Sequence, residues 1–449
     1  MKHLIFLFFL FGIIGCSPNQ NEEFDLIISN VGLIDGTGTD LINNINVYIK
    51  NNKIYTIDSK KIEQKQNIID GRGKFLIPGL FDSHVHTSSY KKDFERFIHF
   101  GITSIFVTGG SKTTNEFYER LRTLGEQDSI AAPRVFHTSQ TMTMEGKHPA
   151  KTYGASSWID GETIFNLRDT LQIESVVNQV SQHPIVGIKL IIEDGPSPPF
   201  VDRILQEFVD KVSKEATRNG KEVFAHISDN TELSMVLKAN IKNIVHFVGI
   251  DLDFENGKQL VDSIYNSDMS WVTTLMLEKS FIYPLYPEWM QRVEDFNVFN
   301  IDDIEMLKDS SYIQRAEQYV YMLQNVWGIE NPNLKNIIIP YVEEINTLNK
   351  NGVNMVLGTD TGNNFIFPGY SLHEEMQLME LGGIKPIDII KMSSHNAAKM
   401  LDVLDTHGTI EVGKYADMIL LDENPLKTIS NTLSINKVIK NGRIQKRIN

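Results

Sequence analysis

The sequence predicts an α/β protein: a (β/α)8 TIM barrel that carries a small composite β-sandwich domain built from the N- and C-terminal segments. Three observations predict this fold. Near-continuous apolar runs alternate with amphipathic segments through the middle of the chain, as expected of parallel strands buried on both faces. Short β-branched runs bounded by turn residues occupy both ends. The length of 449 residues accommodates a barrel and an accessory domain.

The first residues resemble an export signal. Lys2 precedes an apolar run at residues 4–11, which is too short to span a bilayer but has the length of a signal-peptide core. The run ends in Ile-Ile-Gly-Cys16, which resembles the bacterial lipobox, and Cys16 is the single cysteine. We therefore predict a lipoprotein signal peptide over residues 1–15 and lipidation of Cys16. An ordinary signal peptide with an incidental cysteine is the alternative.

A lipidated Cys16 predicts the location of the protein. Residues 16–23 are polar and include a proline, so they are predicted to form a tether between the anchor and the folded body. The protein would then be exported and held by its lipid on the bacterial cell envelope, either on the periplasmic face or at the cell surface.

Strand-like runs lie at both ends of the chain. Residues 24–75 contain three of them, and residues 402–449 contain two more. Neither end has enough strands to bury the face of a sheet alone. We therefore predict that residues 24–75 and 402–449 form the two parts of one β-sandwich.

Residues 76–401 are predicted to form the barrel. The first strand lies in the apolar run at residues 76–86, and seven further runs lie at residues 102–107, 134–137, 186–192, 223–226, 244–247, 271–274 and 355–360. Eight such strand–helix units imply an active site at the carboxyl ends of the strands. Residues 283–332, which are rich in charges, are predicted to form a helical insertion, either a lid or a structural addition.

Polar residues interrupt the apolar runs at a few places. The first run ends in His84 and His86, with Asp82 two residues before, and alternate strand positions share one face. A bare His-x-His is weak evidence for a metal, although neutral imidazole is a common metal ligand. Four later runs each contain one further polar residue, and these are Lys189, His226, His246 and Asp360.

Each of these four residues has an ordinary structural explanation when taken alone. A core histidine often bonds a backbone carbonyl, and an aspartate often caps a helix. A lysine inside a strand is harder to explain, because its charge must be paired or removed. Placed on separate strands of one barrel, the four would converge with the first two histidines at one mouth, which favours a metal centre.

These residues resemble a known superfamily. Pro-Gly-Leu-Phe-Asp-Ser-His-Val-His at residues 78–86 resembles the first-strand signature of the amidohydrolase superfamily, and residues 408–417 resemble its C-terminal signature. The order His-x-His, Lys, His, His, Asp is that of its binuclear members. Residues 357–362 and 371–376 resemble the imidazolonepropionase-like and prolidase-like group within it.

The resemblance implies a set of metal ligands. His84, His86 and Asp360 would hold one divalent ion, and His226 and His246 would hold a second. Lys189, carbamylated by CO2, would bridge both ions. Nitrogen and oxygen ligands without thiolate fit zinc best, with manganese, iron or cobalt as alternatives.

The resemblance also implies an activity, the hydrolysis of amide or peptide C–N bonds in a small-molecule amide or short peptide, as a dipeptidase would perform. A hydroxide bridging the two metals would attack the carbonyl, and Asp360 would carry its proton to the leaving nitrogen. His148 lies where the group has a Gly-Gly-His segment, which makes it the candidate substrate contact. Lys147 and residues 227–229 depart from the pattern of the group.

Two other functions stay open from the sequence. One is a cyclic-amide hydrolase or deaminase that uses a single metal and an unmodified Lys189. The other is a binding lipoprotein without catalysis. Nucleic acid is excluded as a partner, because 57 acidic residues outnumber 43 basic ones, the net charge is −14 and no basic stripe is present. The histidines outside the ligand pattern are predicted to be structural, and these are His99, His137, His183, His395 and His407.

Overall fold

The computed structural model describes residues 23–448 except residues 88, 111–113, 155–157, 196–199, 248, 287–303 and 327. The predicted signal peptide, Cys16 and most of the predicted tether lie outside the described residues, as does part of the predicted insertion. No helix within the described ranges is long and apolar enough to cross a membrane.

Eight parallel strands form a barrel, as predicted. In chain order they are β6 (Leu80–Val85), β7 (Ile102–Val107), β8 (Arg134–Met144), β10 (Gly187–Ile191), β11 (Glu222–His226), β12 (Asn243–Val245), β13 (Ser270–Val272) and β14 (Asn354–Val356). The barrel closes between β14 and β6, where Ser83 N–H donates to the Leu357 carbonyl and Asp360 N–H donates to the His84 carbonyl. A short strand that was not predicted, β9 (Ile164–Leu167), pairs with β8.

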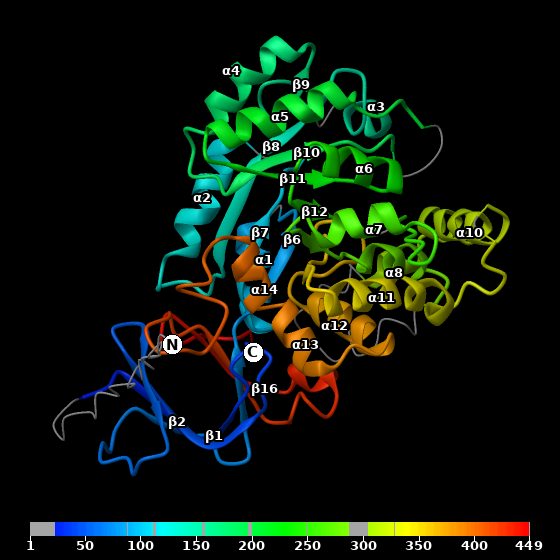
Figure 1. Ribbon diagram of the computed structural model, residues 1–449. Helices are drawn as coiled ribbons and strands as arrows, with labels where there is room; N and C mark the ends of the chain where they lie inside the picture. Colours follow the sequence, from blue (N-terminus) through cyan, green and yellow to red (C-terminus); the bar gives the residue numbers. More distant parts are fainter. Residues whose placement is uncertain are drawn as a thin grey trace, which may run out of the picture.

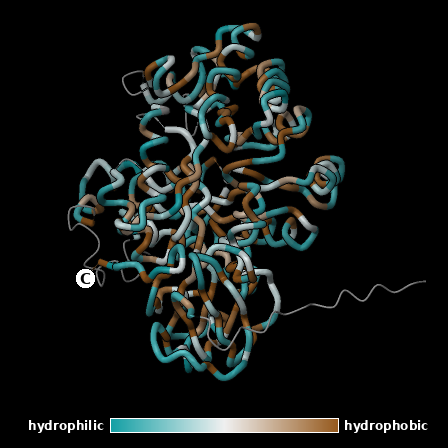
Figure 2. The backbone as a smooth tube through the Cα atoms, turned by 90° about the vertical axis from the view of Figure 1, so that its left-hand side faces the viewer, coloured by the Kyte–Doolittle hydropathy of each residue, from teal (hydrophilic) through white to brown (hydrophobic). Residues whose placement is uncertain are grey.

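Helices surround the strands (Figure 1). They are α1 (Tyr90–His99), α2 (Asn115–Gly125), α3 (Ala150–Tyr153), α4 (Thr170–Val180), α5 (Gln206–Arg218), α6 (Asn230–Lys238), α7 (Lys258–Tyr265), α8 (Met276–Ile282), α10 (Ser310–Asn325), α11 (Leu334–Lys350), α12 (Tyr370–Leu381), α13 (Pro386–Met392) and α14 (His395–Met400), together with the 3-10 turns η4 (Met306–Lys308) and η5 (Ile429–Leu433). Helix α5 shows why they pack there, because it buries Phe208, Val209 and Val212 on one face. Figure 2 shows the hydrophobic segments running through the centre of the molecule.

Apolar side chains from several strands pack against one another inside the barrel. Phe81, Phe106, Phe224 and Val272 come from four different strands and belong to one buried cluster with residues of α14. The rings of Phe106 in β7 and Phe224 in β11 lie 4.7 Å apart between centroids. Because β7 and β11 are not neighbours in the sheet, this contact crosses the interior. This part of the barrel is therefore filled with apolar side chains. The polar side chains gather at the carboxyl ends of the strands.

The two ends of the chain build one small β-domain, as predicted. Its strands are β1 (Leu26–Leu33), β2 (Ile42–Lys50), β3 (Lys53–Asp58), β4 (Ile68–Asp70), β5 (Phe75–Pro78), β15 (Met418–Leu421), β16 (Ile435–Lys440) and β17 (Arg443–Ile444). Strand β5 pairs with β1 on one side and with β15 on the other, so N- and C-terminal segments share one sheet. Figure 1 shows the blue and red strands side by side.

The boundary between the two units differs from the prediction. Residues 76–78 belong to β5 of the small domain, and the barrel begins at Leu80, so the apolar run at residues 76–86 is two strands. Gly79 joins them at a close approach, because a Cβ atom there would lie 2.1 Å from Thr103 Oγ1. In the predicted insertion at residues 283–332, the described part contains η4 and α10.

Candidate metal centre

The structure brings the six predicted ligands together at the carboxyl ends of the barrel strands. His84 lies in β6, Lys189 lies in β10, and His226 ends β11. His86 and His246 directly follow β6 and β12, and Asp360 lies four residues after the end of β14. The His246 ring lies 4.7 Å from the His84 ring and 4.2 Å from the His226 ring, measured between centroids.

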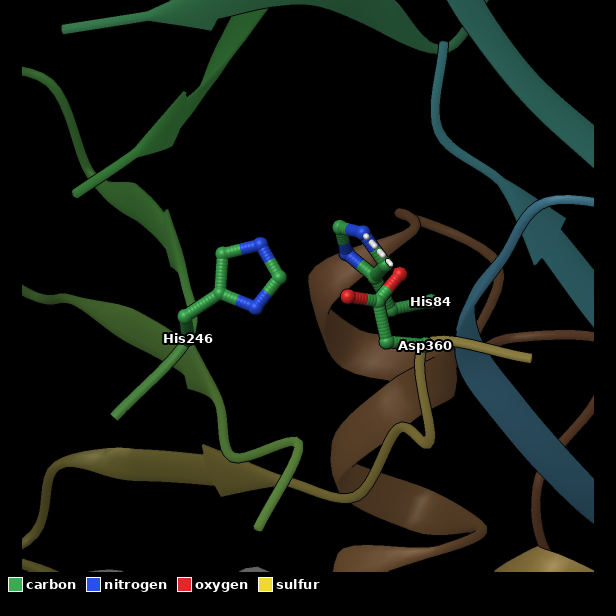
Figure 3. Close-up of side chains that lie close together, drawn as sticks. All are labelled: His84, His246 and Asp360. Atoms are coloured by element: carbon green, nitrogen blue, oxygen red, sulfur yellow. Dashed lines mark ion pairs between the residues drawn. The ribbon is translucent and has the colours of Figure 1, made fainter. Parts of the chain in front are cut away.

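One group of ligand atoms is made by His84, His246 and Asp360, whose donor atoms all lie within 4.8 Å of one another. Figure 3 shows His246 facing the other two side chains. Asp360 Oδ1 lies 3.5 Å from His84 Nε2 and 2.9 Å from His86 Nε2. His86 Nδ1–H donates to the Gly109 carbonyl at 2.8 Å, which assigns the lone pair of this imidazole to Nε2 and directs it at the group.

Several buried polar atoms in this region have no hydrogen-bond partner among the described residues. These atoms are both ring nitrogens of His84, Nε2 of His246 and Nζ of Lys189. A buried donor or acceptor without a partner costs about 1–3 kcal/mol. Imidazole nitrogens and a carboxylate oxygen gathered in this way fit divalent metal ions, which would satisfy the histidine nitrogens.

The protonation states of these side chains suit divalent metal ions. Burial is the main cause that lowers the pKa of His84, His226 and His246 well below the ordinary 6.5, so their imidazoles are neutral at pH 7. Burial also lowers the pKa of Lys189 to about 7, against the opposing charges of Asp360 and Glu193. For Asp360, burial raises the pKa, but His86, His246 and Lys189 outweigh it and lower the pKa to about 2.

A second group is made by His148, Glu193 and His226, whose donor atoms also lie within 4.8 Å of one another. Glu193 Oε2 contacts His226 Nε2 and lies 3.9 Å from His148 Nε2. His148 was predicted as a substrate contact, and Glu193 was not a predicted site residue. Its signal is spacing, because Lys189 and Glu193 lie four residues apart on or just after one strand and so share a face.

The backbone around the first group adopts an unusual conformation. His246, Thr274 and Asp360 have φ values of 74°, 60° and 65°, although none of them is glycine. Such conformations cost on the order of 1–3 kcal/mol each and collect at functional sites. They are held by packing and hydrogen bonds, since His246 Nδ1 lies 2.8 Å from Thr274 Oγ1 and Trp271 Nε1–H donates to the His246 carbonyl at 2.6 Å.

Asp82 and the five histidines that were predicted to be structural lie outside the two groups of ligand atoms. Asp82 belongs to neither group, although it shares β6 with His84. The histidines predicted to be structural are also absent from both groups within the described part of the chain. Four of them have hydrogen-bond partners through Nδ1: His137 donates to the Thr138 carbonyl, His183 contacts Glu119 Oε1, His395 lies 3.0 Å from Asn396 Oδ1 and His407 lies 2.8 Å from Thr406 Oγ1.

Comparison with known proteins agrees with the geometry. The model of the amidohydrolase family matches residues 75–445. An imidazolonepropionase from Thermoplasma volcanium is 22% identical over 90% of this chain and 91% of its own length. An adenine deaminase from Listeria monocytogenes is 24% identical over 94% of this chain and 57% of its own length. The crystal structure of a Xaa-Pro dipeptidase with bound methionine superposes with a TM-score of 0.71 at 21% identity, covering 94% of this chain and 99% of the other.

Proposed function

Because this chain belongs to the amidohydrolase family and is a hydrolase of carbon–nitrogen bonds, we propose that it cleaves amide or peptide bonds in small molecules, with dipeptides as the first substrate class. The observation that carries the proposal is the convergence of His84, His246 and Asp360 at the carboxyl ends of three strands. A prolidase-type structural neighbour, the Xaa-Pro dipeptidase, supports dipeptides as the class to test first.

We propose that the site takes two divalent ions, zinc first and manganese, iron or cobalt as alternatives. The residues that would hold them are His84, His86, Lys189, His226, His246 and Asp360. When bound, such ions polarise a carbonyl group and lower the pKa of a water molecule, so that it can attack near neutral pH. Six ligands support two ions because one tetrahedral zinc needs at most four.

Lys189 is proposed to act as a carbamate. Its side chain is 2% exposed, and its Nζ atom has no hydrogen-bond partner among the described residues. The neutral amine would attack the carbon of CO2, forming an N–C bond and releasing one proton, which leaves an anionic oxygen donor. Lys189 lies in β10, which pairs with β11, the strand that ends in His226, so a carbamate here is proposed to bridge the two ions.

Asp360 is proposed to move the proton. Its low pKa makes it a carboxylate at neutral pH, and its Oδ1 atom lies among the histidine ligands. A carboxylate there can accept the proton of the attacking water and give it to the leaving nitrogen, so that an amine departs instead of an amide anion. Its backbone, fixed by the hydrogen bond from Asp360 N–H to the His84 carbonyl, holds the carboxylate beside the ligands.

A second candidate function is a cyclic-amide hydrolase or deaminase with one metal and an unmodified Lys189. The imidazolonepropionase relative favours it, because it matches about nine tenths of both chains. A substrate panel separates the two candidates. Dipeptides and N-acyl amino acids would release an amine, cyclic amides would open without releasing one, and deamination would release ammonia. Dipeptide cleavage that stops on chelation supports the first candidate, and cleavage of cyclic amides or ammonia release alone supports the second.

We further propose that the protein is exported and held on the bacterial cell envelope by a lipid on Cys16. The support is the sequence, in which a short apolar run ends in Ile-Ile-Gly-Cys16 and no other cysteine follows. A lipid anchor would leave the barrel in an aqueous compartment outside the cytoplasm.

A further inference from the structure

A buried glutamate of α12 reaches the loop that joins β13 to α8. Glu375 is fully buried. Its Oε1 atom accepts from the Thr273 hydroxyl at 2.5 Å and from Leu275 N–H at 2.9 Å, and its Oε2 atom accepts from Met276 N–H at 2.8 Å. These three donors lie on both sides of Thr274 in the chain, so one carboxylate holds the backbone before and after that residue.

Thr274 has a conformation that its surroundings must hold. Its φ is 60°, in the left-handed region, which is unfavourable for a β-branched residue and persists only where the surrounding structure fixes it. Helix α8 gives little local support, because its N-terminal cap residue, Leu275, has no capping side chain. The N–H groups at the start of α8 are instead accepted by Glu375 of α12. The turn at Thr274 is therefore fixed from another helix.

The hydroxyl of Thr274 lies against a proposed metal ligand. His246 Nδ1 lies 2.8 Å from Thr274 Oγ1, and both side chains are buried. His246 Nε2 is also buried and has no hydrogen-bond partner among the described residues, so it is the nitrogen left for a metal ion. A metal-binding nitrogen needs its lone pair, so the proton of the neutral imidazole belongs on Nδ1, where Thr274 Oγ1 accepts it.

We propose that Glu375 is a positioning residue for the metal centre. By binding the residues around Thr274, it holds the Thr274 hydroxyl at His246 Nδ1 and so keeps the ligand lone pair on Nε2. His246 lies with His84 and Asp360 in the first group of ligand atoms, whereas Glu375 belongs to neither group. The inference rests on the proposed metal-dependent hydrolase and adds to it a residue that acts on the metal through two others.

The preceding residue of α12 provides a matched control. Glu374 is 1% exposed, and its Oε1 atom accepts from Lys279 Nζ at 2.7 Å and from the Tyr283 hydroxyl at 2.5 Å. Both glutamates therefore tie α12 to residues 273–283 by buried hydrogen bonds, but of the two it is Glu375 that binds beside Thr274. Loss of helix packing should affect Glu374→Gln and Glu375→Gln alike, whereas loss of positioning should affect Glu375→Gln alone. If Glu375→Gln does not fold, Glu375→Asp, whose carboxylate is one methylene group shorter, takes its place.

The position of the proton on the His246 ring tests the proposal without metal or activity. Nitrogen NMR of the chelated full-length protein with labelled histidine, at about pH 8, distinguishes the two neutral tautomers, and the signal of His246 is the one missing from His246→Asn. We expect the proton on Nδ1 in the wild type and in Glu374→Gln, and a mixture of both tautomers in Glu375→Gln and Thr274→Val. A wild-type ring protonated on Nε2 overturns the proposal, as does a pure Nδ1 tautomer in Glu375→Gln.

Zinc affinity, measured by competition with a coloured chelator, tests the consequence for the metal. Glu375→Gln and Thr274→Val should each bind one zinc ion roughly 10- to 100-fold more weakly than the wild type and Glu374→Gln. The double variant should bind it no more weakly than Thr274→Val, because both changes act through one hydroxyl group. Losses that add in the double variant, or equal losses in Glu374→Gln and Glu375→Gln, overturn the proposal. If the wild type binds no zinc, the proposed metal-dependent hydrolase fails, and the imidazole spectra still decide whether Glu375 positions His246.

Discussion

The carboxylate of Asp82 accepts two hydrogen bonds from Thr359, one from its hydroxyl group at 2.7 Å and one from its backbone N–H at 3.0 Å. Asp82 lies in β6 and Thr359 follows β14, so the pair ties the first barrel strand to the last where the barrel closes. Both residues are fully buried. Because Thr359 directly precedes Asp360, this pair positions a proposed metal ligand without being one.

Asp82→Ala should therefore destabilise the protein. It leaves the Thr359 N–H group buried without an acceptor, while the Thr359 hydroxyl keeps only Thr361 Oγ1 within reach, and we expect the free energy of unfolding to fall by about 2 kcal/mol. Asp82→Asn keeps one acceptor oxygen and should cost about 1 kcal/mol. Urea denaturation in the presence of a chelator measures both values. Equal stability of wild type and Asp82→Ala would show that the pair does not hold the barrel closed.

Lys189→Ala should remove the proposed carbamate. We expect it to lower the zinc content and abolish hydrolysis, while a short carboxylic acid added to the variant restores part of both by supplying the missing oxygen donors. If Lys189 instead stays an unmodified amine with a structural role in the barrel, the main effect is on stability and no acid restores activity. Native mass spectrometry that finds an unmodified lysine in active, zinc-loaded protein would rule out the carbamate.

Glu278 should make stability depend on pH. Its side chain in α8 is 3% exposed and accepts a hydrogen bond from the Tyr319 hydroxyl, and burial raises its pKa from 4.5 to about 7. The folded state therefore favours the protonated acid. The stability that this gives is complete below about pH 4.5 and is lost as the pH rises through 7.

We thus expect wild type to lose about 2 kcal/mol relative to Glu278→Gln between pH 5 and pH 8. Urea denaturation of both proteins with chelator present, at several pH values in that range, measures the difference. Chelation removes the pH dependence of metal binding from the comparison. Parallel stability curves for the two proteins would mean that Glu278 ionises in the folded state as it does in the unfolded chain.

Cys16→Ser should release the protein from the membrane. The lipid on Cys16 is the only anchor that the sequence predicts, and no helix in the described part of the chain could take its place. Cell fractionation together with labelled fatty acid checks this, with the variant expected in the soluble fraction without label. Incorporation of label into Cys16→Ser at the wild-type level would exclude the anchor.

The fold was predictable because a buried parallel strand leaves a continuous apolar run in the sequence, as residues 102–107 and 223–226 show. The break at Gly79 was not predictable in this way, because both β5 and β6 are apolar and only their pairing partners separate them. Strand β9 was missed because its four residues, Ile164–Leu167, are too short for a clear pattern.

The site was predictable as a set of residues but not as two groups. Lys189, His226 and Asp360 stand out because each interrupts an apolar run. Which donor atoms meet depends on distances across the barrel, and the sequence alone does not contain them. Glu193 was not predicted as a site residue because the Glu-Asp-Gly segment at residues 193–195 has the composition of a turn, although Glu193 lies beside His226.

The most direct test of the proposed function is the hydrolysis rate of a dipeptide panel by metal-free protein as zinc is added back. We predict no cleavage after chelation and recovery of the rate with zinc, up to about two ions per chain. His84→Asn should not recover, while His183→Asn, a variant of a partly exposed histidine outside both groups, should recover fully. Cleavage at an undiminished rate by the metal-free protein, or full recovery of His84→Asn, would contradict the assignment of this site as a metal-dependent hydrolase.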